Sequence, residues 1–99
     1  MMRGVALFVV LCAVLLHVTP VRADEAAFRN YMTAAGESVK RKDHAAAASM
    51  FELAVNATES FGSSDERLVA ALYGLGRAQR ALHDYAPAEA SFRRALAIL

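Results

Sequence analysis

The sequence predicts an all-α protein in which two antiparallel helix–turn–helix repeats stack as a short α-solenoid after an N-terminal signal helix. The main observation is a pattern that occurs twice, 41 residues apart, with copies that start at Asp43 and Asp84. A segment with helical periodicity precedes each copy, and an apolar run opens the chain. The first copy contains Asp43, His44, Ala47, Phe51, Ala54 and Val55, and the second contains Asp84, Tyr85, Ala88, Phe92, Ala95 and Leu96.

Residues 1–23 have the features of a secretory signal peptide. A short positive start that ends at Arg3 precedes the apolar run 5–18, and Ala23 is the small residue expected before a cleavage point. The run is 14 residues long, whereas a helix that crosses a bilayer needs roughly 20. We therefore expect cleavage after Ala23 and a secreted or periplasmic mature protein. The alternative is a protein that the uncleaved signal anchors to a membrane.

The mature protein would carry no cysteine and almost no net charge. Cys12 belongs to the signal, and the large Leu11 before it argues against a lipidated cysteine, so no disulfide would brace the fold. From residue 24 onward, nine lysines and arginines face ten aspartates and glutamates. This balance lacks the basic excess that is typical of nucleic-acid binding. Membrane association would rest on an uncleaved signal alone.

The first repeat is expected over residues 24–62. Its first helix, 24–42, has acidic residues at its start and basic residues at its end, as the helix dipole favours. Gly36 inside this helix would let a neighbour approach closely. Asp43 is the expected N-cap of the second helix, which should fade before a loop at 62–64. The apolar face of the first helix is predicted to hold Ala27, Tyr31, Ala35, Ser38 and Val39.

The second repeat is expected over residues 63–99. Ser63 and Glu66 have the spacing of a capping box, in which each side chain bonds a free backbone N–H of the other's turn. Gly74 and Gly76 on this helix would suit a tight helix crossing or the close approach of a ligand backbone. The buried stripe is predicted to be Leu68, Leu72, Leu75, Gln79 and Leu82.

The last helix begins after Asp84, a second expected N-cap, and Pro87 falls in its first turn, where the missing N–H does no harm. The given sequence stops inside the apolar pattern, without a glycine, a proline or a polar cap. We therefore expect the last face to be completed by a partner, by self-association through this helix, or by further residues of a longer protein. The apolar stripe consists of Ala88, Phe92, Ala95, Leu96 and Leu99.

At these residues the sequence resembles the tetratricopeptide repeat family, whose helix–turn–helix units usually span 34 residues. In the first repeat, alanines 34 and 35 and His44 stand where the family has leucine–glycine and tyrosine. The 41-residue spacing and the loop 61–65 are similar to the longer repeats of kinesin light chains. A generic alanine-rich four-helix bundle is the alternative, and it shares nearly every helix. The second repeat matches more fully, through Leu75, Gly76, Tyr85, Ala88, Phe92 and Ala95.

The resemblance implies a non-catalytic scaffold that binds a protein or peptide, because in this family the first helix of each repeat lines a concave groove. Its basic and aromatic residues would suit an acidic segment or the free carboxyl terminus of a partner, since guanidinium groups pair well with carboxylates. The family's lysine–asparagine clamp for chaperone tails is not reproduced, and the charges could equally serve only to solvate the helices. The groove positions that the resemblance implies are Arg29, Met32, Gly36, Lys40, Tyr73, Arg77 and Arg80.

The residues predict no catalytic, cofactor or metal site. His44 and His83 lie at different turns, whereas metal ligands usually share one face at close spacing. Nothing has the pattern of a catalytic triad or a phosphate loop. Asn56 starts a triplet with the form of a glycosylation acceptor, although it lies on a predicted helix. Besides an independent scaffold, the protein could be the N-terminal fragment of a larger tetratricopeptide protein or a helical appendage of an enzyme.

Overall fold

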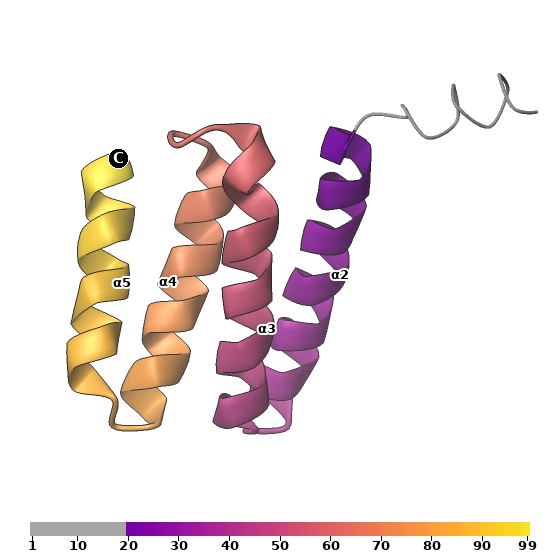
Figure 1. Cartoon of the computed structure of the whole chain (residues 1–99). Coiled ribbons are helices and arrows are strands. Elements are labelled where there is room, and N and C mark those ends of the chain that lie inside the picture. The colour runs from indigo at the N-terminus through magenta and orange to yellow at the C-terminus, as the bar shows by residue number, and fades with distance from the viewer. Residues whose placement is uncertain (1–19) are drawn as a thin grey trace, which may run out of the picture.

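The computed structural model describes residues 20–99, and the apolar run of the expected signal lies outside them. The described residues form four α-helices and one short 3-10 helix. Each helix packs against the next in the sequence, so that α2, α3, α4 and α5 follow one another in antiparallel order (Figure 1). The elements are α2 (Pro20–Lys40), α3 (His44–Ala57), η1 (Thr58–Phe61), α4 (Glu66–Ala81) and α5 (Tyr85–Ile98).

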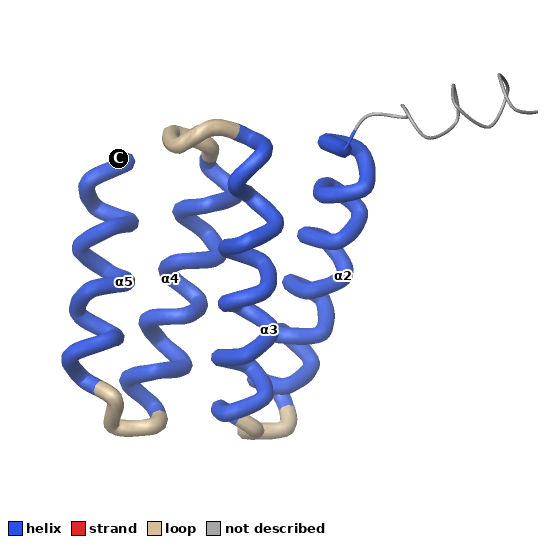
Figure 2. Tube along the Cα trace, in the orientation of Figure 1, coloured by secondary structure: helices blue, strands red, loops and turns tan. Residues whose placement is uncertain are grey.

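The connections confirm two helix–turn–helix pairs. Figure 2 shows the turns after α2 and α4 at one end of the molecule and the loop after η1 at the other end. Lys42 and His83, which are 41 residues apart, both adopt positive φ, 60° and 65°, in the two turns. In each turn the next aspartate amide donates to a carbonyl of the helix just ended, Asp43 to Ser38 and Asp84 to Gln79, both at 2.9 Å. The repeat is therefore present in the backbone as well as in the sequence.

The loop between the pairs reverses the direction of the backbone where the sequence predicted it. Gly62 has φ 100°, a left-handed conformation that favours glycine because a side chain would clash with the backbone. The predicted capping box at its end is wrong. Ser63 lies in the turn, and the N-cap of α4 is Asp65, whose side chain accepts a hydrogen bond from the Arg67 amide at 2.8 Å. Glu66 is the first residue of α4, one turn too early to complete a capping box.

The boundaries of α2 also differ from the prediction. The helix begins at Pro20 and ends at Lys40, whereas the sequence suggested 24–42. Proline fits the first turn of a helix, because that turn has no partner for its N–H. Lys42 cannot be helical at its positive φ. Asp24 therefore lies inside the helix, and the predicted cleavage point after Ala23 falls within α2.

The core is built on the predicted phenylalanine and alanine positions. Phe51, Ala54 and Val55 of α3 are buried, and Ala88 and Ala95 of α5 are buried as well. Phe92 is half-buried, with its ring against the backbone of Gly76. Gly74 and Gly76 thus serve tight helix crossings, one of the two roles that the sequence allowed. The leucines of the α4 stripe that are buried are Leu68, Leu72 and Leu75, whereas Leu82 is exposed.

The buried face of α2 is rotated from the predicted one. Phe28 is buried and packs edge-to-face on Phe61, with ring centres 6.1 Å apart, although the sequence analysis did not select it. Ala35 and Ser38 are buried as expected, but Val39 is exposed. Phe28, Ala35 and Ser38 share one helical face, so the position of Phe61 fixes this rotation. No helix within residues 20–99 has the length and apolar content needed to cross a membrane.

Candidate functional site

The face shared by α2 and α4 contains a hollow near the start of both helices. Its volume is about 510 Å³. Phe28 and Met32 of α2 and Ala70 of α4 provide apolar surface, and Arg29 lies exposed at the rim. This hollow brings together two of the positions that the sequence analysis selected, Arg29 and Met32, with residues that it did not. The lining residues are Phe28, Arg29, Met32, Thr33, Glu66, Arg67 and Ala70.

A second hollow, of about 260 Å³, lies at the opposite end of the same two helices, beside the turns. Arg77 and Arg80 of α4 line it, next to Val39 of α2 and His44 at the start of α3. Two further predicted positions are thereby placed together in a basic environment. The first hollow offers apolar walls and the second offers guanidinium groups. We call the α2–α4 face that carries both hollows the groove.

The backbone of α2 is open between the two hollows. A Cβ atom placed on Gly36 would have no described atom within 4 Å apart from its own helix. The close neighbour that the sequence predicted at this glycine is therefore not part of residues 20–99. Thr33, one turn earlier, directs its hydroxyl to the Arg29 carbonyl at 2.9 Å and so does not project it freely. The centre of the groove thus has room for an incoming peptide.

The arginine at the rim of the first hollow, Arg67, is already engaged. Its guanidinium donates to Asp65 at 2.8 Å and to Glu25 at 3.4 Å, and its central carbon lies 3.7 Å from the centre of the Phe61 ring. Hydrogen bonds from the Arg67 side chain and backbone lower the pKa of Asp65 to about 2. The same bond to Asp65 raises the pKa of Arg67. This charge stabilises the loop and does not point to a ligand.

The other basic residues of the groove are differently placed. Within residues 20–99, Arg29, Arg77 and Arg80 take part in no ion pair, whereas Lys40 pairs with Glu37 at 3.5 Å on the surface. The guanidinium carbon of Arg77 lies 5.8 Å from the centre of the Tyr73 ring, within the range of a cation–π contact. Lys40 lines neither hollow, so the structure does not bring it together with the other predicted residues.

Tyr73 is placed apart from the groove hollows. Its ring packs on Phe92 of α5, with centres 5.7 Å apart, and it lines a different depression between α4 and α5. The sequence analysis also missed His44 and Phe28 as lining residues. Phe28 lies one helical turn before Met32, and this spacing was a signal that could have identified it.

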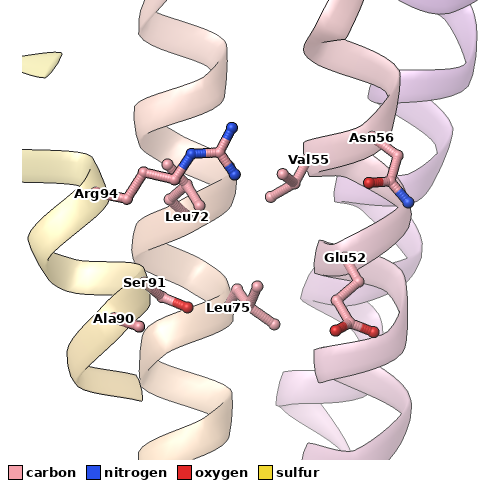
Figure 3. A pocket seen from close by; sticks show the side chains of 8 residues that line it. All are labelled: Glu52, Val55, Asn56, Leu72, Leu75, Ala90, Ser91 and Arg94. Atoms are coloured by element: carbon pink, nitrogen blue, oxygen red, sulfur yellow. The ribbon is translucent and has the colours of Figure 1, made fainter. Parts of the chain in front are cut away.

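Another hollow, of about 440 Å³, opens between α3 and α5 (Figure 3). Arg94 extends from α5 over Leu72, while Glu52 and Asn56 stand on α3. Asn56 is exposed at this rim, in the last turn of α3. Thr58 of the same triplet is 1% exposed and donates its hydroxyl to the Val55 carbonyl at 2.6 Å. The folded structure therefore hides the threonine that a glycosylating enzyme must recognise.

The two histidines do not meet. His44 is the first residue of α3, and His83 lies in the α4–α5 turn, where its Nδ1 is 2.8 Å from the Tyr85 hydroxyl. Among the described residues, no three histidine, cysteine, aspartate or glutamate side chains are grouped so as to hold a metal ion. The site with the most varied chemistry is thus the groove, which offers shape, apolar surface and positive charge.

Comparison with known proteins agrees with this architecture. No curated protein and no solved structure matches the sequence. The family model described as tetratricopeptide repeat matches residues 37–99, which is well over half of the sequence and includes α3, α4 and α5. Helix–turn–helix pairs with a common period are the structural unit of this family. The protein therefore belongs to the tetratricopeptide repeat family.

Proposed function

We propose that this protein is a non-catalytic scaffold that binds a peptide or protein partner in the groove between α2 and α4. The observation that carries the proposal is the pair of hollows on one face, one apolar and one basic, separated by the open backbone at Gly36. An extended peptide needs this combination, with a pocket for one side chain, a charged contact for another and space for its backbone.

We propose that the partner presents an acidic segment or a free C-terminal carboxylate. Arg77 and Arg80 line the second hollow, and Arg29 stands at the first one, without ion pairs inside residues 20–99. A guanidinium forms short, paired hydrogen bonds with a carboxylate, and these bonds are stronger than those between neutral groups. The apolar wall formed by Phe28 and Met32 would accept an aliphatic or aromatic side chain of the same peptide.

The remaining proposals concern where the protein acts and which subgroup it belongs to. We propose that residues 1–23 are removed as a secretory signal, which the N-terminal residue of the mature protein tests, with Asp24 expected. The period of 41 residues and the loop 61–65 support a kinesin-light-chain-like long repeat. If Asn56 is glycosylated, modification has to precede folding, because Thr58 is buried afterwards.

A peptide library tests the groove. Random peptides with free carboxyl ends would be selected on the purified protein, and the enriched sequences measured by fluorescence anisotropy. We expect enrichment in aspartate and glutamate. The double variant Arg77→Glu with Arg80→Glu should bind the selected peptides at least about tenfold more weakly, since one lost charge-assisted contact is worth roughly 1.5 kcal/mol or more.

The matched control makes the same change of charge on α5. Arg93 and Arg94 lie outside the groove, and Arg93→Glu with Arg94→Glu alters the net charge equally. This control variant should keep wild-type affinity. An equal loss in both variants would show that the peptides respond to overall charge only, and an unchanged affinity in the groove variant would remove Arg77 and Arg80 from the site.

A further inference from the structure

The face between α4 and α5 exposes large apolar side chains. A depression of about 510 Å³ separates the two helices there. Tyr73 is 55% exposed, Leu96 69% and Leu99 85%, although leucines in regular helices of folded domains are usually covered. Figure 1 shows α5 at one end of the row of helices. We define the α4–α5 face by Val69, Tyr73, Phe92, Ala95, Leu96 and Leu99.

The first repeat shows what covers the same positions. Phe92 and Leu96 lie 41 residues after Phe51 and Val55, which are both buried, at 8% and 9% exposure. The helix that packs against Phe51 is α4, because the Phe51 ring lies against Gly74. In the second repeat, Phe92 is only half-buried and Leu96 is exposed. The exposed face is therefore equivalent to an interface that is already formed inside the molecule.

The contact between α3 and α4 also defines the shape of a suitable helix. A Cβ atom on Gly74 would lie 2.6 Å from Phe51 Cζ, which is closer than real Cβ contacts, so only glycine fits there. The neighbouring contacts come from leucines that are 7% exposed or less: Leu68, Leu72 and Leu75. A helix that packs against Phe92 in the same way needs the same order of residues, Leu-x-x-x-Leu-x-Gly-Leu.

We infer that the α4–α5 face is a docking site for an amphipathic helix of a partner protein that carries this Leu-x-x-x-Leu-x-Gly-Leu pattern. The helix would lie beside α4 and α5 as α4 lies beside α2 and α3. Its glycine would face Phe92, and its leucines would cover Leu96 and the depression beside Tyr73. This site is separate from the groove, and it stands whether or not the groove binds peptides.

A second copy of the protein is a poor occupant for the face. In head-to-tail stacking, α2 of the next copy would take the place of the docked helix. The residue of α2 that corresponds to Gly74 is Thr33, whose branched side chain would collide with Phe92. The positions of Leu68 and Leu75 are taken by Ala27 and Ala34, which bury far less apolar surface. The uncovered face thus favours a helix of a different protein.

The first test uses a synthetic peptide with the sequence of residues 63–82, labelled with a fluorophore, and measures its binding to the purified protein by anisotropy. We expect saturable binding. A second peptide replaces its glycine at the position of Gly74 by leucine and should bind at least about tenfold more weakly, because overpacking against a ring costs roughly 1–3 kcal/mol. Leucine favours the helix more than glycine does, so weaker binding cannot arise from lost helicity.

The second test changes the protein. Leu96→Asp removes apolar surface at an exposed position, so the fold should persist, and it should weaken binding of the first peptide at least about tenfold. Leu53→Asp is the matched control, because Leu53 is an exposed leucine on α3 outside this face, and it should leave binding unchanged. The groove variant Arg77→Glu with Arg80→Glu should also bind the peptide normally.

Three results would overturn the inference. Absence of saturable binding would show that the face does not accept such a helix. Equal affinity of the glycine and leucine peptides would show that Phe92 does not set the shape of the site. A wild-type dimer in analytical ultracentrifugation that Leu96→Asp dissociates would identify a second copy as the occupant in place of a partner helix.

Discussion

The guanidinium of Arg67 lies 3.7 Å above the ring of Phe61, and this contact connects the end of η1 to the start of α4. The same guanidinium bonds Asp65 in the loop and Glu25 on α2. The loop and the two helices are thereby joined at one end of the groove. The relative position of the two repeats depends on this cluster, because the loop 62–65 provides the covalent link between them.

The cluster predicts a specific dependence of stability on pH. The pKa of Asp65 is about 2 in the folded protein, whereas an aspartate in an unfolded polypeptide has a pKa of about 3.9. Because the folded pKa is the lower one, the stabilising contribution is complete above the unfolded pKa and is lost as the pH falls from about 4 to about 2. Thermal unfolding followed by circular dichroism should show this decline.

The variant Asp65→Asn isolates the charge, because asparagine can still act as an N-cap. Its unfolding temperature should be lower than that of the wild type at neutral pH and should approach the wild-type value at a pH of about 2, where Asp65 becomes protonated. Parallel curves for the two proteins across this range would mean that Asp65 contributes nothing through its ionisation.

The two helix caps of the repeat turns predict different effects of one substitution. Asp43 accepts a hydrogen bond from the Ala46 amide at 3.1 Å, whereas the side chain of Asp84 makes no capping hydrogen bond. Asp43→Ala should therefore lower the free energy of unfolding by about 1 kcal/mol. Asp84→Ala should lower it by much less. Urea denaturation of both variants measures the difference, and equal losses would contradict it.

The glycines of α2 and α4 predict opposite responses to alanine. Gly74→Ala places a methyl group 2.6 Å from Phe51 Cζ, and the buried ring has little room to move. We expect a loss of roughly 1–3 kcal/mol in the free energy of unfolding, partly offset by better helix propensity. Gly36→Ala meets no described atom within 4 Å and should raise the free energy of unfolding by up to about 1 kcal/mol. Guanidinium chloride denaturation compares the two, and a stabilising Gly74→Ala would contradict the packing.

Much of the fold follows from local signals. The periodicity around Phe51, the aspartates before α3 and α5, and the glycine at position 62 act within a few residues of themselves. For this reason the helices, the turns and the phenylalanine–alanine seam were predicted correctly. The exchange of Ser63 for Asp65 as the cap of α4 shows the limit of such signals, because both residues can cap and the choice depends on where Arg67 is held.

The site was harder to predict, because it depends on how the repeats stack. Family resemblance placed Arg29, Met32, Arg77 and Arg80 on one face, and the structure brings them into two hollows of that face. Tyr73 was assigned to the same surface, but the rotation of α4 directs its ring to Phe92. Such rotations are set by contacts between residues far apart in the sequence, which periodicity within one helix does not determine.

The most direct test of the central claim is a map of amide chemical shifts on addition of the best acidic peptide from the library. We predict that the shifts concentrate on the groove, at Arg29, Met32, Gly36 and Arg77, and that Arg77→Glu with Arg80→Glu removes them. Shifts confined to the hollow between α3 and α5, around Glu52 and Arg94, would contradict the assignment of the groove as the binding site.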